Sequence, residues 1–376
     1  MGECPTGWRS TSIGEVLTLQ RGFDITKADQ TQGDVPVISS GGVSSYHNVA
    51  MTKGPGVVLG RKGTLGRTYY VTSDYWPHDT TLWVRDFKGN NPRFVYYFFS
   101  TLDFRYLDVG SANPTLNRNH VHPIRIVWPP LTEQRSIAEV LGALDDKIEA
   151  NQSLRALART LGMALFRREL GEGTHYRPVG EMCASISRGV APRYTKEDDG
   201  VRVLNQKCIR DGWISLSPSR WMREVNVQTG RLAKPGDVLV NSTGVGTLGR
   251  VARWLGPGLI HVDGHVTIAR PDNTKCPSTV FSYGMLNAQA DIEALGEGST
   301  GQTELNRSRL AHLAISLPSR SNVDVLDQTL DSLDQCAQRH SDESECLSAL
   351  RDTLLPKLMS GELRVRDAEE LIEEAV

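Results

Sequence analysis

The sequence predicts an α+β protein in which two similar strand-rich domains are separated by two long antiparallel helices that form a coiled coil. The first observation is that the pentapeptide GTLGR occurs twice, at 63–67 and at 246–250. The second is that the segments around it repeat in the same order. The third is that each repeat is followed by a segment with the leucine spacing of a coiled coil. Two copies of one domain in a single chain favour a pseudo-two-fold internal repeat.

The first domain is expected over residues 1–130 and the second over residues 173–318. In both, a lysine and a Pro/Gly turn precede a β-branched run, a Gly-rich turn with GTLGR, and another apolar run, which predicts strand, turn and strand. Upstream, IGEV at 13–16 resembles VGEM at 179–182, and downstream GSANPTLNR at 110–118 resembles GSTGQTELNR at 298–307. The offset between matched segments grows from 166 to 189, so the second block has gained residues.

Residues 131–172 predict a central spacer helix, and residues 319–376 predict a C-terminal spacer helix with an acidic tail. Apolar residues spaced by four and three positions give a narrow seam along each helix, and such a seam needs a partner helix. The other spacer helix, packed antiparallel, is the expected partner. Asn151, His340 and Arg351 are polar members of the seam that weaken apolar packing and can set the register, although His340 is more simply explained as a tolerated surface histidine. The predicted apolar seam consists of Ile137, Leu141, Leu144, Ile148, Leu157, Leu161 and Leu165 with Leu326, Leu330, Leu333, Leu347, Leu354 and Leu358.

The composition is that of an ordinary globular protein, with 39% hydrophobic and 23% charged residues. No apolar run is long enough to span a membrane, and the first residues lack the apolar core of a secretion signal, so we expect a cytoplasmic protein without membrane contact. The six cysteines are scattered, which argues against a zinc ribbon or a disulfide framework.

The net charge of −2 is distributed unevenly along the chain. Residues 1–130 and 173–318 carry +3 and +4, whereas residues 131–172 and 319–376 carry −1 and −8. The two strand-rich domains are therefore mildly basic, which permits DNA binding without demonstrating it. Two similar domains held apart by a paired-helix spacer could bind a rod-like target at two separated patches. Duplex DNA is such a rod, and its equivalent positions recur about every 10 base pairs on one face.

Several stretches resemble a known family, in an order that covers essentially the whole chain, and PVISSGG at 36–42, GRKG at 60–63 and GDVL at 236–239 match its recognition-domain pattern. The run 116–149, which contains LNR and VWPPLTEQRSIAEVLGALDDKIE, is similar to the junction of the first recognition domain and the central helix in specificity subunits of type I restriction–modification enzymes. The tail LRDTLLPKLMSGEL at 350–363 resembles the C-terminal helix of that family. The second junction, at 317–324, departs from the pattern because it lacks the Pro-x-x-Glu-Gln signature of the first.

The resemblance implies that residues 1–130 and 173–318 are target-recognition domains, each of which reads one half of a bipartite site in double-stranded DNA. It implies a subunit without catalytic activity that docks two methyltransferase subunits and, optionally, two ATP-dependent restriction subunits. No cofactor is expected on this chain, since S-adenosylmethionine, ATP and Mg²⁺ belong to the partner subunits. The fixed gap between the half-sites would be set by the spacer helices.

Candidate DNA contacts are polar and cationic residues on or near the repeated turns, because such groups donate to phosphates or to base edges. The glycines of these turns are more simply explained by the turn itself. The candidates of the first domain are Ser39, Ser40, Tyr46, His47, Arg61, Lys62, Thr64, Arg67, His78 and Asn113. Those of the second domain are Arg188, Arg193, Tyr194, Asn205, Gln206, Lys207, Asn241, Ser242, Thr243, Thr247, Arg250, His265, Gln302 and Thr303.

The pairs Asn117-Arg118 and Asn306-Arg307 are identical between the repeats. Residues that read different half-sites should differ, so these pairs are expected to hold the fold or a phosphate.

Two other function classes remain open at this point. A protein-only scaffold with two binding domains would share the same architecture. An enzyme such as a nuclease would need a catalytic cluster, and Asp79 and Asp263, next to His78 and His265, are the only candidates; no repeated nucleophile or metal cluster accompanies them. The sequence also lacks a Walker A motif and an adenine methyltransferase signature.

Overall fold

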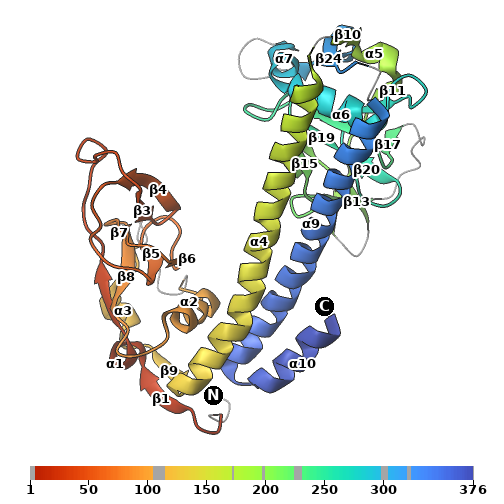
Figure 1. Ribbon diagram of the computed structural model, residues 1–376. Coiled ribbons are helices and arrows are strands. Elements are labelled where there is room, and N and C mark those ends of the chain that lie inside the picture. Colours follow the sequence, from red (N-terminus) through yellow and green to blue (C-terminus); the bar gives the residue numbers. More distant parts are fainter. Residues whose placement is uncertain are drawn as a thin grey trace. The chain divides into compact units, whose positions relative to one another are not determined.

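The computed structural model describes residues 5–104, 115–171, 173–196, 200–223, 231–297, 304–319 and 323–375. The chain forms two compact units: unit 1 contains Met1–Glu149 and Ser344–Val376, and unit 2 contains Ala150–Glu343. Each unit holds one strand-rich domain together with a part of both long helices (Figure 1). The division therefore cuts through the helices, whereas the domain boundaries expected from the sequence follow the helix ends.

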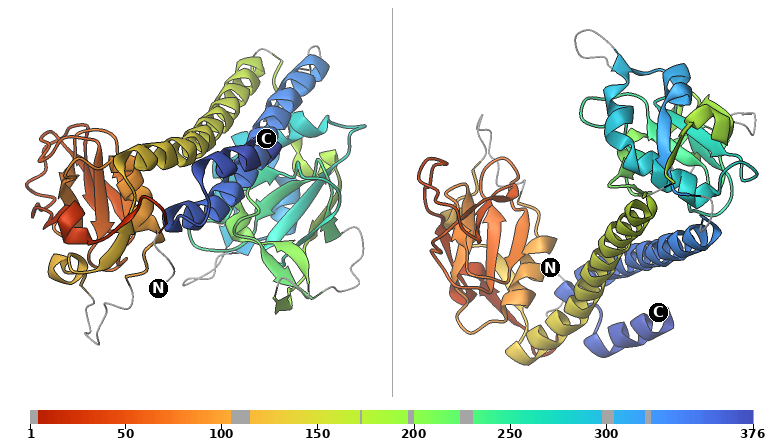
Figure 2. Two further views of the ribbon diagram at one scale, coloured as in Figure 1. Left: turned by 90° about the horizontal axis from the view of Figure 1, so that it is seen from below. Right: turned by 45° about the horizontal axis from the view of Figure 1, so that its top comes forward.

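Unit 1 is built on a four-stranded sheet in the order β2-β8-β5-β6. The strands are β2 (Thr18–Arg21), β5 (Gly56–Gly60), β6 (Thr68–Val71) and β8 (Thr81–Asp86). Strand β5 is buried along its whole length, and Val57 and Leu59 belong to one core with Phe94 and Val95 of α2 (Pro92–Thr101). Helix α2 begins where Asn91 accepts a hydrogen bond from the Phe94 amide and proline occupies the first turn. It lies on one side of the sheet (Figure 1 and Figure 2).

A smaller sheet and a strand pair complete this domain. Strands β4 (Gly42–His47), β3 (Val35–Ser39) and β7 (Trp76–Pro77) form the sheet, and β3 and β7 are parallel. Strand β1 (Arg9–Ser12) pairs antiparallel with β9 (Arg125–Trp128). The short helices α1 (Ile13–Val16) and α3 (Arg118–Val121) lie next to this pair in the chain.

Unit 2 repeats this arrangement. Its main sheet has the order β11-β21-β18-β19, formed by β11 (Cys183–Arg188), β18 (Val238–Asn241), β19 (Val251–Arg253) and β21 (Val266–Pro271). Strand β10 (His175–Pro178) pairs antiparallel with β24 (Ala314–Leu317), as β1 pairs with β9. Helices α5 (Val179–Met182), α6 (Ser278–Asn287) and α8 (Arg307–His312) take the places of α1, α2 and α3.

The second sheet of unit 2 is larger than that of unit 1. It has the order β12-β16-β13-β20-β17, in which β13 (Val201–Leu204) and β20 (Ile260–Val262) are parallel like β3 and β7. Strand β16 (Arg220–Met222) pairs antiparallel with β13 as β4 pairs with β3. The additional elements are β12 (Tyr194–Thr195), β14 (Ile209–Arg210), β15 (Trp213–Ile214), β17 (Leu232–Ala233), β22 (Gly296–Glu297), β23 (Glu304–Leu305), the 3-10 helix Gln206–Cys208 and α7 (Gln289–Ala294). Most of the inserted strands precede Lys234, where the sequence offset grows, and the matching sheet orders confirm the predicted internal repeat.

Two long helices, α4 (Leu131–Glu169) and α9 (Val323–Ser360), contact each other and confirm the predicted helix pair. In unit 1 the first half of α4 packs against the second half of α9, so the two run antiparallel (Figure 1). Ile137, Leu141, Leu144 and Ile148 are buried there in one core with Leu347, Leu354 and Leu358. In unit 2, Leu326 and Leu330 of α9 are buried with Phe166 of α4, while Leu165 and Leu333 are half-buried.

Leu157 and Leu161 do not form the seam that the sequence predicts, because they are 61% and 46% exposed. An α-helix turns about 100° per residue, so a step of six from Ile148 to Leu154 moves by about 240° around the helix. The 4-3 spacing continues instead through Asn151, which is buried, and half-buried Arg155. The inward face of α4 in unit 2 is therefore polar in its first turns, and the leucines lie outside it.

The acidic tail expected after the second spacer helix contains a further helix, α10 (Val365–Ala375). Its Ala368 is fully buried in the core of unit 1, and Val365 and Ile372 pack against the same core. Glu133 of α4 accepts hydrogen bonds from Arg364 Nη1 at 2.8 Å and from Trp8 Nε1 at 2.7 Å. In the described part of the chain, no helix is both long and apolar enough to cross a membrane.

Candidate nucleic-acid interface

The first GTLGR turn joins β5 to β6 in unit 1. The Gly60 amide donates to the Arg67 carbonyl and the Gly66 amide donates to the Gly60 carbonyl, each at 2.8 Å, which closes the turn. Gly66 has a φ of +74°, and a Cβ there would meet the ring of buried Phe104. Only glycine fits such a position without strain, so this glycine serves the turn itself.

Two other loops meet this turn. The Thr64 hydroxyl donates to the carbonyl of Ser40, and the Tyr69 hydroxyl donates to the same carbonyl at 2.9 Å. The amides of Arg61 and Lys62 donate to the Thr80 carbonyl at 2.9 and 3.2 Å. Residues 39–42, 61–67 and 78–80 thus form one connected group, which we call loop cluster 1.

Asp79 is the acidic residue at the base of loop cluster 1. Its carboxylate lies 2.9 Å from Arg21 Nη2 and 3.0 Å from His78 Nδ1, and its side chain is 15% exposed. Burial raises the pKa of Asp79, but the hydrogen bond from Arg21 and the charges of His78 and Lys62 outweigh it, so the pKa lies below its ordinary value. The carboxylate is therefore ionised and already paired inside the protein.

The cations of loop cluster 1 remain on its surface. Lys62 and Arg67 are exposed, and the Arg67 guanidinium lies 5.5 Å from the centre of the Tyr69 ring. Arg61 is half-buried, and its Nη1 lies 3.4 Å from the Asp79 carbonyl oxygen. Cations beside a closely approachable Gly-rich backbone are the groups that bind phosphates.

Unit 2 contains the same construction around the second GTLGR turn, between β18 and β19. The Asn241 amide donates to the Arg250 carbonyl at 2.9 Å, and the Gly249 amide donates to the Asn241 carbonyl at 2.8 Å, as at Gly60 and Gly66. Residues 205–207, 241–250 and 263–265 meet here as loop cluster 2. Val245, at the tip of the longer turn, is 84% exposed.

Different side chains connect the loops of cluster 2. The Thr243 hydroxyl lies 3.1 Å from Gln206 Oε1 and 2.9 Å from His265 Nδ1. Arg250 Nη2 donates to the Gly246 carbonyl at 2.8 Å, and the Thr247 hydroxyl donates to the Gly244 carbonyl at 3.2 Å. His265 and Lys207 are exposed beside them. The backbone framework is thus shared by the two clusters, whereas the exposed groups differ.

Arg188 lies at the end of β11 in unit 2. It pairs with Glu304, and its Nη2 donates to the Leu305 carbonyl at 2.6 Å. Arg188, Glu304, Asn306 and Arg307 line an open hollow of about 490 Å³. Sequence analysis missed its counterpart Arg21, which holds Asp79, although QRG at 20–22 repeats as SRG at 187–189 and could have identified it.

Four candidates are buried and bonded within the protein, so their side chains do not face a ligand. His47 Nδ1 accepts from the Thr31 amide at 2.9 Å, and Asn205 caps the turn at Lys207 and donates to the Pro218 carbonyl. Asn241 Nδ2 donates to the Gln206 carbonyl at 2.9 Å, and the Ser242 hydroxyl lies 2.6 Å from that of Thr267. Buried polar groups need such partners, which explains these residue types without DNA.

The remaining candidates lie apart from these contacts or outside the described residues. Ser40 contributes its carbonyl rather than its side chain to cluster 1, and the Ser39 hydroxyl donates to the Gly42 carbonyl at 3.0 Å. Tyr46 is exposed on β4; Arg193 and Tyr194 are exposed at β12. Asn113, Gln302 and Thr303 fall outside the described residues.

The repeated Asn-Arg pairs have a structural role. Asn117 accepts from the Asn119 amide at 3.0 Å and caps α3, and Asn306 accepts from the Ser308 amide at 2.8 Å and caps α8. Shortly before each cap, the chain forms an isolated β-bridge with its loop cluster. Thr115 pairs with Lys62 in unit 1, and Glu304 pairs with Thr243 in unit 2. Among the described residues, no group of three or more His, Cys, Asp or Glu could hold a metal ion.

Comparison with known proteins gives one family match and several fold matches. Residues 5–158 match the family model described as type I restriction modification DNA specificity domain. The chain is similar to the type I restriction-modification system S subunit from M. genitalium, with 18% identity over 93% of this chain and 96% of that one, and a TM-score of 0.65. The HsdS subunit from Thermoanaerobacter tengcongensis is 20% identical over 96% of this chain and 99% of that one, with a TM-score of 0.35. A chain from a structure of complex assembly and conformational transition of the type I R-M system is 20% identical over 96% of this chain and 100% of that one, with a TM-score of 0.40.

Proposed function

Because residues 5–158 match the family model of type I restriction modification DNA specificity domains and the fold is similar to that of an S subunit, we propose that the chain is a DNA-reading specificity subunit. Each strand-rich domain reads one half of a bipartite site in double-stranded DNA. Loop cluster 1 contacts one half-site, and loop cluster 2 contacts the other. The helix pair α4 and α9 sets the gap between them.

One observation carries this proposal: the two loop clusters share a backbone framework but differ in their exposed groups. Both frameworks use the same closing hydrogen bonds, at Gly60 and Arg67 and at Asn241 and Arg250. Cluster 1 exposes Lys62 and Arg67, whereas cluster 2 exposes Lys207 and His265. A common framework that positions different side chains is what the reading of two unlike sequences requires.

The exposed and half-buried polar groups of the two clusters divide by chemistry into two roles. Cations donate to phosphates regardless of sequence, which positions each domain on the duplex. In this proposal Arg61, Lys62, Arg67, Lys207 and Arg250 have that role. Hydroxyl, amide and imidazole groups form specific hydrogen bonds with base edges. Thr64, His78, Gln206, Thr243, Thr247 and His265 are proposed to have this second role.

The subunit is proposed to act without chemistry of its own. Two methyltransferase subunits that use S-adenosylmethionine dock on it and methylate adenine in the bound site, and two restriction subunits that use ATP and Mg²⁺ join optionally. The family supports these partners, since a specificity domain selects DNA for other subunits. This chain supplies the site and the spacing.

The proposal is tested by adenine methylation mapping in cells with and without the gene. We expect a single bipartite motif that disappears on deletion. Exchange of residues 173–318 for those of another family member should change one half of the motif and leave the other half and the gap unchanged. A motif that changes in both halves would contradict the assignment of one half-site to each domain.

Binding experiments separate the alternatives. A protein-only scaffold would show no sequence-specific retardation of DNA, and no salt dependence, even with a methyltransferase partner present. A nuclease would cleave DNA with Mg²⁺ in the absence of any partner. We expect specific, salt-dependent binding with the partner and neither cleavage nor methylation by the purified chain alone.

A further inference from the structure

The junction between the strand-rich domain and the helices is filled in unit 1. The Trp128 indole packs edge-on against Phe94 and Phe98 of α2, with ring centres 5.2 and 4.9 Å away. Its Nε1 donates to Asn90 Oδ1 at 2.8 Å, and Gln134 Nε2 donates to the same oxygen at 2.8 Å. Trp128 and Gln134 are 2% and 1% exposed, so ring and amide together close this space.

Unit 2 has smaller side chains at the equivalent positions. Leu317 stands opposite His175 in the β10–β24 pair, as Trp128 stands opposite Arg9 in the β1–β9 pair. Tyr97 of α2 and Tyr283 of α6 both bond to an aspartate of a long helix, which aligns the two helices. With this alignment the replacements are Trp128 by Leu317, Phe94 by Val280, Phe98 by Gly284, Asn90 by Cys276 and Gln134 by Val323.

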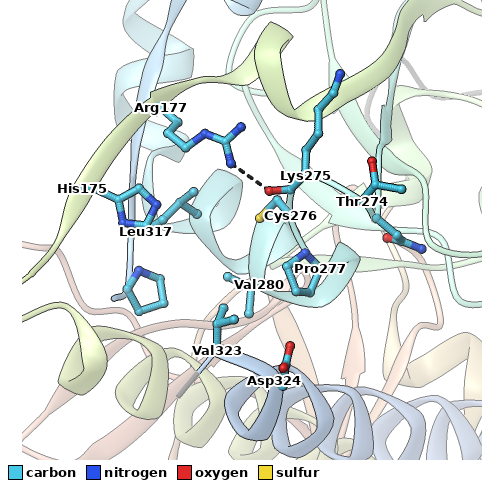
Figure 3. A pocket seen from close by; sticks show the side chains of 12 residues that line it. His175, Arg177, Thr274, Lys275, Cys276, Pro277, Val280, Leu317, Val323 and Asp324 are labelled. Carbon is cyan, nitrogen blue, oxygen red and sulfur yellow. Dashed lines mark hydrogen bonds between the residues drawn. The ribbon is translucent and has the colours of Figure 1, made fainter. Parts of the chain in front are cut away.

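A cavity of about 540 Å³ lies at this place in unit 2, and we call it the junction pocket (Figure 3). Cys276, Val280, Leu317 and Val323, four of the five replacing residues, line it. Burial raises the pKa of the Cys276 thiol to about 11, so this lining is uncharged at neutral pH. The size suits a ligand-binding pocket, for which about 300–1,000 Å³ is typical.

The rim of the junction pocket carries two cations, Arg177 and Lys275. His175, Arg177 and Lys275 line it, and Arg177 Nη1 donates to the Lys275 carbonyl at 2.8 Å (Figure 3). Unit 1 has Thr11 and Gly89 where unit 2 has Arg177 and Lys275. Lys275 Nζ lies 3.3 Å from Asp272, and exposed Asp324 is the acidic residue of the lining. The second repeat has therefore lost an internal aromatic ring and gained two cations at the same place.

We propose that the junction pocket binds an aromatic side chain of indole size that a partner protein presents from an acidic segment. Unit 1 shows that an indole fits this part of the fold, between the first turn of α2 and the strand pair. Arg177 and Lys275 favour carboxylates on either side of the inserted ring. The site is independent of the loop clusters, so this proposal does not require DNA reading.

Direct binding to the full-length chain tests the proposal. The probe is the peptide Ac-Glu-Asp-Trp-Glu-NH₂ with a fluorinated indole, observed by fluorine NMR. Two further peptides serve as controls. Ac-Glu-Asp-Ala-Glu-NH₂ lacks the indole and is added as a competitor, and Ac-Lys-Lys-Trp-Lys-NH₂ carries the same fluorinated indole between cations. We expect saturable binding of the acidic tryptophan peptide, at least tenfold weaker binding of the basic one, and no competition by the alanine peptide.

Variants of the chain locate the site. Leu317→Trp restores the ring of unit 1 and should weaken binding at least tenfold, and Val280→Phe fills the same space from α6. Arg177→Ala keeps the cavity open and should weaken binding of the acidic tryptophan peptide at least threefold. Arg210→Ala is the matched control: it removes an exposed arginine of unit 2 that is paired with Asp211, and it should leave peptide binding unchanged. Absence of saturable binding to the unaltered chain, or unchanged binding in a folded filling variant, would overturn the proposal. DNA retardation by the Leu317→Trp and Arg177→Ala chains should match the unaltered chain, which distinguishes failure of this proposal from failure of DNA reading.

Discussion

The Tyr97 hydroxyl donates a hydrogen bond of 2.6 Å to Asp145 Oδ2. Unit 2 contains the same contact, since the Tyr283 hydroxyl donates to Asp334 Oδ1 at 2.9 Å. In each unit the aspartate on one long helix also faces an arginine of the other, Arg351 at 2.7 Å from Asp145 and Arg159 at 3.4 Å from Asp334. A single carboxylate, 23% exposed at Asp145 and fully buried at Asp334, thus ties the domain helix to both long helices, and the repeat preserves this arrangement.

Substitution of Tyr97 or Tyr283 by phenylalanine should destabilise the corresponding unit. Burial and the nearby Asp145 raise the pKa of Tyr97, so its hydroxyl is protonated and available as a donor. Loss of the donor leaves a half-buried (Asp145) or fully buried (Asp334) carboxylate with one partner fewer, which costs about 1–2 kcal/mol. Urea unfolding measures the change in free energy. Tyr46→Phe is the matched control because Tyr46 is 56% exposed, and an equal loss in the control would contradict the assigned role.

Substitution of Asn117 or Asn306 by alanine should lower stability by about 1 kcal/mol each, because each removes a helix N-cap. The two residues belong to the framework that both repeats share. Methylation mapping should therefore return an unchanged motif at lower efficiency. A changed half-site sequence in either variant would show that the asparagine reads a base.

Lys62→Ala should weaken DNA binding by nearly the same factor on every sequence. A lysine that neutralises one phosphate contributes about one unit to the slope of log affinity against log salt concentration. The slope should become shallower by about that amount, as measured by retardation at several salt concentrations. Lys53→Ala is the control, since Lys53 is also exposed but precedes strand β5 whereas Lys62 follows it. Equal slopes in the two variants would remove loop cluster 1 from the interface.

Asp79→Asn should reduce the stability of unit 1 in a pH-dependent way. The folded pKa of Asp79 lies below its ordinary value of 3.8, so the ionised carboxylate stabilises the fold above that value. This contribution is lost as the pH falls through the folded pKa. We expect a difference of about 0.5–1 kcal/mol between the two chains at pH 7, because Arg21 is half exposed, and convergence once the pH has fallen through the folded pKa. Unfolding curves at a series of pH values test this, and a constant difference would contradict it.

The sequence predicted the repeat because the residues that build it are local signals. GTLGR closes the same turn twice, and the Asn-Arg pairs cap equivalent helices. The candidate contacts were harder to predict because asparagine and serine suit a buried loop as well as a base edge. Asn241 and Ser242 hold loops together in the fold, and only the tertiary structure separates them from exposed Lys207 and His265.

The seam of α4 was predicted correctly as far as the sequence kept its period. Up to Ile148 the steps of four and three residues lead to buried positions. Beyond Ile148 the next leucine in the sequence is Leu154, six residues on, whereas the inward face of the helix continues three residues on, at buried Asn151. The junction pocket was also beyond prediction, since it depends on three side chains that come together from β24, α6 and α9. The sequence indicated a difference at this place only through the second junction, at 317–324, which lacks the Pro-x-x-Glu-Gln signature of the first.

Lengthening both long helices near their polar contact should lengthen the gap between the half-sites. Asn151 Nδ2 donates to Glu343 Oε2 at 2.9 Å, and Asn151 is 1% exposed, so the two helices are in register here. Four residues inserted after Asn151 and four before Glu343 add about 6 Å and turn each helix by about 40° beyond a full turn. The inward faces are then nearly preserved, and the methylated motif should keep both halves with a gap longer by about one or two base pairs.

Two residues inserted at the same places are the control for this experiment. They turn each helix by about 200°, which moves the inward face outward, so the helix pair and DNA methylation should both fail. Methylation mapping and urea unfolding of the two insertion variants give the comparison. If the four-residue variant is stable and methylates the original gap, the helix pair does not set the spacing. If it changes a half-site sequence instead, the helices determine recognition and not distance, and the assignment of spacing to α4 and α9 is wrong.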